Sequence, residues 1–112
     1  MKTWVAQLRK GLVEFTVLAA LRADEAYGYE LLQRINKIEG LALTESTVYP
    51  LLARLTRDKL LTVRVAPSPA GPPRRYYRLT DLGKDHLHEM AGHWRQVQTG
   101  VDGLLNATGA TP

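Results

Sequence analysis

Residues 44–65, TESTVYPLLARLTRDKLLTVRV, contain the change of hydrophobic period that decides the fold. In the first half, apolar residues recur at spacings of three and four, as on one face of a helix. From residue 61 they alternate with other residues, as in a half-buried strand. The helical set is Val48, Leu51, Leu52 and Leu55, and the strand set is Leu61, Val63 and Val65. The stretch therefore predicts a helix that leads almost directly into a strand.

The start of this helix depends on Pro50, because proline has no N–H to donate and is favoured only in the first turn. Thr44 is a suitable N-cap, and Thr47 stands where a capping box would carry a glutamate. The residues alone leave two alternatives. The helix begins near Tyr49, or it begins near Glu45 and lacks one hydrogen bond.

On the C-terminal side, a proline-rich loop separates two predicted strands. Residues 66–73, APSPAGPP, contain four of the six prolines, so we expect an extended loop there. The side chains of residues 75–79 alternate between the two faces of a predicted strand. Tyr77 is on the apolar face, where we expect it to pack in the core. Gly71 in the loop favours a turn, so the two strands are predicted to pair as a hairpin.

Two amphipathic helices are predicted before this stretch, over residues 3–23 and 27–39, with a polar break at residues 22–26 between them. Gly40 follows the second helix directly and is a typical stop signal. The apolar positions are Val5, Leu8, Leu12, Phe15 and Ala19 in the first helix, and Leu31, Leu32, Ile35 and Ile38 in the second.

A long last helix is predicted after Thr80, whose side chain can cap it, with Asp81 near the positive end of the helix dipole. Its apolar residues have the 3, 4, 3, 4, 3 spacing of a seam that packs against another helix. Gly92, Gly100 and Gly103 lie off this seam and weaken the helix unless a partner holds it. The seam residues are Leu87, Met90, Trp94, Val97, Val101 and Leu104.

The composition excludes several classes of protein. A chain of 112 residues with 45% hydrophobic and 23% charged residues fits one globular domain and not a disordered chain. The absence of cysteine excludes a disulfide framework, a thiolate zinc site and a cysteine nucleophile. No stretch approaches the roughly 18 apolar residues of a membrane span, and the N-terminus lacks the features of a signal peptide. We therefore expect a cytoplasmic protein with no membrane contact.

Catalysis and metal binding have little support in the sequence. No nucleophile–base pair and no phosphate-binding glycine loop is present, so we expect no enzyme activity and no cofactor. Glu89 and His93 have the i, i+4 spacing of a metal pair, but His86 is about 10 Å from His93 along the helix, too far to share one ion. We expect no metal site.

The positive charge is concentrated in one region. The net charge of the chain is +4, but residues 44–78 hold seven cationic and two acidic side chains, a net +5, and the rest hold eight and nine, a net −1. Three helices, a hairpin and a long helix are the order of a winged helix-turn-helix, a mainly α (α+β) fold with a two-stranded wing. Ser46 and Thr47, followed by Arg57, suit a helix in a major groove. A solvated basic face is the alternative.

Three blocks of the sequence resemble the PadR-like transcriptional regulators: YGYELL at 27–32, TVYPLLARL at 47–55, and RRYYRLT at 74–80 with Gly83. The resemblance covers about residues 8–101. In relatives the recognition helix begins before the Tyr-Pro pair, which favours the start near Glu45. The single C-terminal helix is similar to the small subgroup of the family, whose members dimerise through the first and last helices.

The resemblance implies a homodimeric repressor of double-stranded DNA that recognises a palindromic operator. We therefore expect a winged helix-turn-helix domain at 1–79, a dimerisation helix at 80–106 and a disordered tail at 107–112, with recognition helix 45–58 and wing 66–75. A winged-helix module that binds proteins instead of DNA is the alternative. With Arg57, the predicted DNA contacts are Tyr29, Ser46, Thr47, Tyr49, Arg54, Lys59, Arg74 and Arg75.

Similarity to drug-sensing relatives also implies an effector site, in which Trp94 stacks on a planar cation at the dimer interface. The alternatives are that Trp94 only packs in the seam and that Glu14 forms an ion pair with Arg9, Lys10 or an arginine of the partner. The predicted effector residues are Trp94, Met90, Gln98, Glu14 and Phe15. The predicted dimer interface is Leu8, Leu12, Phe15, Leu87, Met90, Trp94, Val97, Val101 and Leu104.

Overall fold

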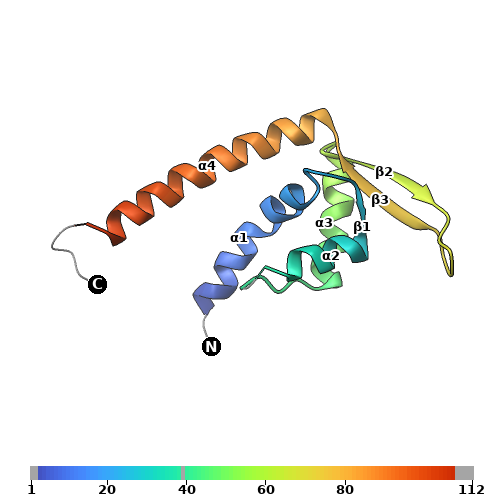
Figure 1. The fold of residues 1–112 in the computed structure, drawn as a ribbon, viewed down its shortest axis with the longest axis horizontal. Helices are drawn as coiled ribbons and strands as arrows, with labels where there is room; N and C mark the ends of the chain where they lie inside the picture. The colour runs from blue at the N-terminus through green and yellow to red at the C-terminus, as the bar shows by residue number, and fades with distance from the viewer. Residues whose placement is uncertain (1–2, 39, 108–112) are drawn as a thin grey trace.

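The computed structural model describes residues 3–38 and 40–107, and these contain four helices and three strands (Figure 1). In chain order the elements are α1 (Thr3–Ala20), β1 (Ala26–Tyr27), α2 (Gly28–Asn36), α3 (Glu45–Arg57), β2 (Leu61–Ala66), β3 (Arg74–Leu79) and α4 (Asp81–Leu105). This order confirms the predicted winged helix-turn-helix of the mainly α (α+β) class with a long last helix.

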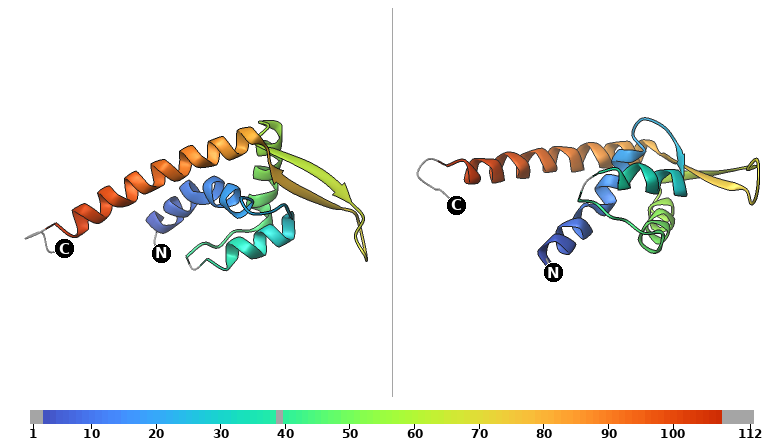
Figure 2. Two further views of the ribbon diagram at one scale, coloured as in Figure 1. Left: turned by 45° about the horizontal axis from the view of Figure 1, so that its top comes forward. Right: turned by 60° about the horizontal axis from the view of Figure 1, so that its bottom comes forward.

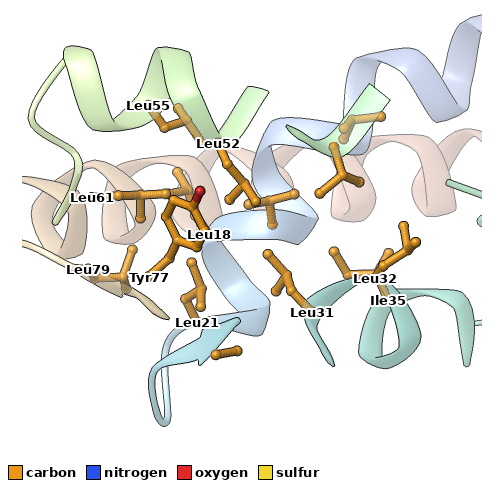
Figure 3. Packing of buried hydrophobic residues seen from close by; sticks show 14 of the residues in the cluster. Leu18, Leu21, Leu31, Leu32, Ile35, Leu52, Leu55, Leu61, Tyr77 and Leu79 are labelled. Atoms are coloured by element: carbon orange, nitrogen blue, oxygen red, sulfur yellow. The ribbon is translucent and has the colours of Figure 1, made fainter. Parts of the chain in front are cut away.

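The helices α1, α2 and α3 pack around an aliphatic core that the sheet closes on one side (Figure 3). Leu18, Leu31 and Leu52 come from the three helices and are completely buried. Leu61 of β2 and Tyr77 of β3 join them, which confirms the prediction that Tyr77 packs in the core. Each such leucine contributes about 1.5–3 kcal/mol by leaving water. The shared core fixes which face of α3 points outward.

The wing contains a third strand that the sequence did not predict. The strand order is β1-β3-β2, with Ala26 opposite Tyr77 and Tyr27 opposite Tyr76 in an antiparallel pair. The predicted hairpin of β2 and β3 is present and projects away from the helices (Figures 1 and 2). A strand of two residues is too short to show an alternating pattern, so only its pairing reveals it.

The helix α3 begins at Glu45, as the family resemblance implied, and contains Pro50 in its second turn. The N–H that proline lacks would have bonded to the carbonyl of Ser46, which is an exposed residue. Thr44 occupies the N-cap position, but its hydroxyl makes no capping bond and lies 2.8 Å from the Ser46 hydroxyl instead. One missing bond at a solvated position explains why the helix tolerates its proline.

The first two helices are shorter than predicted. Helix α1 ends at Ala20 instead of residue 23, and α2 spans Gly28–Asn36 instead of residues 27–39, of which residue 39 lies outside the described residues. Arg34 donates to the Ala20 carbonyl at 2.8 Å and so satisfies the end of α1. Apolar periodicity does not report such terminal bonds, so it overestimated both helices.

The helix α4 starts at the base of the wing, packs on α1 and then extends beyond the other elements (Figures 1 and 2). The Thr80 hydroxyl accepts from the Gly83 N–H at 3.0 Å, which confirms the predicted cap. No helix within residues 3–38 or 40–107 is both long and apolar enough to cross a lipid bilayer. Of the predicted tail, residues 108–112 lie outside the described part of the chain.

Candidate nucleic-acid interface

The outward face of α3 carries small polar residues and, near its C-terminal end, Arg57. Ser46, Thr47 and Arg57 are exposed, whereas Val48 and Leu52 are completely buried on the opposite side. The core therefore fixes the rotation of the helix and presents the hydroxyl groups together. Short polar side chains at the start of a projecting helix allow close approach to base edges.

A shallow groove of about 230 Å³ joins three segments that are distant in sequence. It brings together four of the predicted contact residues: Tyr29 of α2, Tyr49 of α3, and Arg74 and Arg75 of β3. The other lining residues are Tyr27, Gly28, Pro73 and Tyr77. Sequence predicted the four contact residues one by one, and the structure shows that they share one surface.

Gly28 explains how Tyr49 reaches this groove. A Cβ atom at position 28 would lie 2.3 Å from Cε1 of Tyr49, so any other residue would displace the tyrosine ring. Loss of solvent around the Tyr49 hydroxyl, reinforced by the nearby Glu45 carboxylate, raises its pKa. The hydroxyl is therefore neutral at physiological pH and able to donate a hydrogen bond.

The arginines of the wing differ in their partners. Arg64 forms a two-point ion pair with Glu25, at 2.5 and 3.2 Å, and this hydrogen bond lowers the pKa of Glu25. Neither Arg74 nor Arg75 has a carboxylate within ion-pairing distance among the residues that the structure describes. The charge of these two side chains is therefore not cancelled by any residue that the structure describes.

Arg54, another predicted DNA contact, does not line this groove and has carboxylate partners within the chain. Its guanidinium lies 2.5 Å from the Glu14 carboxylate of α1 and 3.3 Å from Asp58. His86 of α4 lies 3.2 Å from the other oxygen of Glu14. Partial burial of Glu14 acts to raise its pKa, but the hydrogen bonds from Arg54 and His86 outweigh it and lower the pKa. Arg54 thus fastens α3 to α1.

Lys59 also lies apart from the groove. It follows the C-terminal end of α3 with φ of 65°, and its carbonyl accepts a bond of 2.6 Å from the Thr80 hydroxyl. Ser46 stands at the other end of α3, and a helix of 13 residues is about 20 Å long. If Lys59 contacts DNA, it would therefore contact a different part of the DNA from the part that Ser46 contacts.

A second candidate site lies between α1 and α4. A cavity of about 470 Å³ is lined by Leu8, Leu12, Phe15, Met90 and Trp94, together with Gln7, Gly11, His93 and Val97. The rings of Phe15 and Trp94 are 6.1 Å apart, and Trp94 is 40% exposed. Trp94, Met90 and Phe15 thus lie together, as the effector prediction requires.

Two other predicted effector residues are not in that cavity. The Glu14 carboxylate is held by Arg54 and His86 and does not line the cavity. The partner of Glu14 is neither Arg9 nor Lys10, which were its predicted partners within the chain. Gln98 is not among the lining residues of the cavity. The lining contains no carboxylate, so its chemistry is aromatic and apolar.

The predicted interface residues fall into two groups. Leu87 is already buried in the core of the single chain, at 7% exposure. Leu12, Phe15 and Met90 are half-buried. Leu8, Trp94, Val97, Val101 and Leu104 are exposed, with Leu104 at 76%. Only the C-terminal part of the seam and its neighbours on α1 are thus free to bury further surface.

No three His, Asp or Glu side chains gather as metal ligands within residues 3–38 and 40–107. The sequence did not point to Glu25 or Arg64, and it indicated Tyr27 only as part of the YGYELL motif. Alternation in the two hairpin strands puts Arg64 and Tyr76 on the outer face, which was an available signal. The contribution of β1 to that face was not predictable from local pattern.

Comparison with known proteins gives a consistent result. Residues 17–89 match the family described as Transcriptional regulator PadR-like family. A PadR-like transcriptional regulator from Bacillus cereus has a similar structure, with a TM-score of 0.81 and 38% identity, covering 89% of this chain and 97% of that one. A PadR family transcriptional regulator from Eggerthella lenta has a TM-score of 0.81 and 35% identity, covering 94% of this chain and 91% of that one.

A third relative is the negative transcriptional regulator PadR of Bacillus subtilis, which is 29% identical over 80 residues, or 70% of this chain. Bacillus subtilis PadR in complex with operator DNA has a similar structure, with a TM-score of 0.67 and 28% identity over 71% of this chain. This chain covers 46% of that solved chain, less than half of its length.

Proposed function

Because this chain belongs to the PadR-like family of transcriptional regulators, we propose that it is a homodimeric repressor that binds a palindromic DNA operator. The observation that carries the proposal is the shared surface formed by the outward face of α3 and the groove beside the wing. It combines the hydroxyls of Ser46 and Thr47 with the charges of Arg74 and Arg75, which have no ion-pair partner among the described residues. Hydroxyls and arginines of this kind bind base edges and phosphates.

Dimerisation is supported by the exposed part of α4. Val97, Val101 and Leu104 follow the heptad seam but remain 56%, 46% and 76% exposed in the single chain. We propose that residues 80–106 form the dimerisation helix, residues 1–79 form the DNA-binding domain, and a second copy covers the seam together with Leu8 of α1. Two-fold symmetry then presents two copies of α3 to two half-sites, which is why we expect a palindrome.

Repression and effector binding are further parts of the proposal. The name of the Bacillus subtilis relative, a negative regulator, supports repression. The aromatic cavity at Trp94 supports an effector with a flat aromatic body, and its position between α1 and α4 supports a link to the dimer. A ligand that favours one arrangement of the dimer would change the spacing of the two α3 helices.

Selection from random-sequence duplexes tests the proposal. We expect the wild-type protein to enrich a palindrome whose half-site centres are about one helical turn, or a multiple of it, apart. Thr47→Val removes a hydroxyl on the outward face at nearly constant volume, and it should change the enriched bases without preventing binding. Ala53→Ser is the matched control, because it also changes a small exposed side chain of α3 but does not remove the Thr47 hydroxyl.

Failure to enrich any palindrome would contradict the operator proposal and would favour the alternative of a protein-binding winged helix. If the wild type and Thr47→Val enrich the same bases, Thr47 does not take part in base recognition. Sedimentation of the same samples, which measures the mass of the protein in solution, gives the number of chains. A single chain at micromolar concentration would contradict the dimer.

Binding of a planar aromatic dye tests the effector site. We expect the dye to quench tryptophan fluorescence in the wild type and in Trp4→Phe, because Trp94 is then the reporter that stacks on it. Trp94→Ala should weaken dye binding at least tenfold, measured by the anisotropy of the dye itself. Because Glu14 is paired elsewhere, a neutral dye of the same size should bind as well as a cationic one. Unchanged anisotropy titration in Trp94→Ala would refute stacking on this residue.

A further inference from the structure

We propose that Tyr27 is a positioning residue for DNA binding, whose ring holds the guanidinium of Arg74 at the groove beside the wing. This inference rests on the proposed function. It assigns a role to β1, the strand that the sequence did not predict, and to the outer face of the sheet. The outer face is not needed to form the core, because Ala26 of β1 and Tyr77 of β3 reach the core from the inner face.

The sheet register places three of the side chains in one row. Tyr27 of β1 lies opposite Tyr76 of β3, and Tyr76 lies opposite Arg64 of β2. Residues that are directly opposite in an antiparallel pair share a face of the sheet. Arg74 precedes Tyr76 by two residues on β3, so it shares that face as well. The row thus runs across the whole sheet and ends beside α2.

The side chains of the row are in contact. The guanidinium carbon of Arg64 lies 4.7 Å from the centre of the Tyr76 ring, and that of Arg74 lies 4.3 Å from the centre of the Tyr27 ring. The two rings meet edge to face, with centres 5.5 Å apart and planes at 70°. Both distances to the cations are within the range of cation–π attraction.

The two ends of the row differ in charge. Glu25 binds Arg64 through two hydrogen bonds and neutralises it, which anchors that end. Arg74 has only the Tyr27 ring as a partner for its charge among the described residues, and both residues line the groove with Tyr29 and Arg75. A ring orders a guanidinium without cancelling its charge. Arg74 therefore loses less side-chain entropy when it binds a phosphate.

The test compares Tyr27→Leu with Tyr27→Phe, by the anisotropy of a labelled random-sequence duplex at low salt. This probe suffices because phosphate contacts do not depend on sequence. We expect Tyr27→Leu to weaken binding about five- to thirtyfold, since a dimer loses the contact twice. Tyr27→Phe keeps the ring face and should stay within about twofold of the wild type. Equal losses in both variants would overturn the proposal.

Double variants with Arg74 distinguish a positioning role of Tyr27 from a merely structural one. In an Arg74→Gln background, Tyr27→Leu should change binding less than about twofold, whereas in an Arg75→Gln background it should keep its full effect. An undiminished effect of Tyr27→Leu in the Arg74→Gln background would overturn the inference. If neither Arg74→Gln nor Arg75→Gln weakens binding of the duplex, the proposed function of the wing fails, and this inference fails with it.

A readout without DNA tests the contact on its own. In the NMR spectrum of the free protein, the Tyr27 ring should shift the Hδ protons of Arg74 upfield, and Tyr27→Leu should abolish the shift. Tyr27→Phe should preserve it. Arg74 resonances at ordinary arginine positions in the wild type would overturn the inference, whatever the DNA measurements show.

Discussion

Gly83→Ala is expected to destabilise the protein by about 3 kcal/mol, the sum of a backbone clash and a weakened helix cap. A Cβ atom at position 83 would lie 2.1 Å from the carbonyl oxygen of Leu60. That carbonyl also accepts the Thr80 N–H at 3.1 Å, and the Gly83 N–H donates to the Thr80 hydroxyl. The start of α4 cannot move away without breaking these bonds between α4 and the base of the wing.

Urea unfolding of the variant and the wild type at equal protein concentration measures this difference, since the stability of a dimer depends on concentration. Gly92→Ala is the matched control in the same helix, because a Cβ atom there meets nothing within 4 Å. It should stabilise the helix by about 0.5–1 kcal/mol, the opposite sign. If Gly83→Ala unfolds at the wild-type urea concentration, α4 is not fixed to the wing by this close approach.

The double variant Arg74→Gln/Arg75→Gln is expected to lose two to three orders of magnitude in DNA affinity at about 0.15 M salt. A dimer would lose four cationic contacts, and each neutralised phosphate contributes about 0.9 to the slope of log affinity against log salt. The slope should therefore become less steep by about 3 to 4. Neither arginine has an ion-pair partner in the described chain, so folding should be nearly unaffected.

Anisotropy titrations with one duplex at several salt concentrations measure the slope. The matched control is Arg22→Gln/Arg95→Gln, which removes the same charge from two exposed positions outside the wing. It should change the slope by less than about 1. A wild-type slope in the wing variant, or an equal loss in the control, would show that net charge and not the wing determines the affinity.

Much of the fold was predictable because the signals are local. The change from helical to alternating period at residue 61, the Thr80 cap and the proline-rich loop each follow from residues a few positions apart. Pro50 shows the limit of such reasoning, because the residues alone left two helix starts open. The family resemblance decided for Glu45, and the structure confirms it.

The candidate site was only partly predictable. Ser46, Thr47, Arg74 and Arg75 were identified by type and position; the structure exposes Ser46 and Thr47 on α3 and brings Arg74 and Arg75 into one groove with Tyr49 of α3. Arg54 looked equivalent to Arg57 in sequence, since both are cations on the polar side of the same helix. They differ because Glu14 lies 40 positions earlier in the chain and meets only one of them.

The sequence by itself determined the order of helices and strands, the inward face of α3 and the concentration of charge between residues 44 and 78, because each depends on spacing along the chain. The tertiary structure alone decided which charges stay free and which are paired. Glu14 with Arg54, Glu25 with Arg64, and Tyr27 with Arg74 all join separate segments. Such pairs depend on how the helices and the sheet pack against each other. Hydrophobic burial sets that packing, and it is not specific to any one pair of residues.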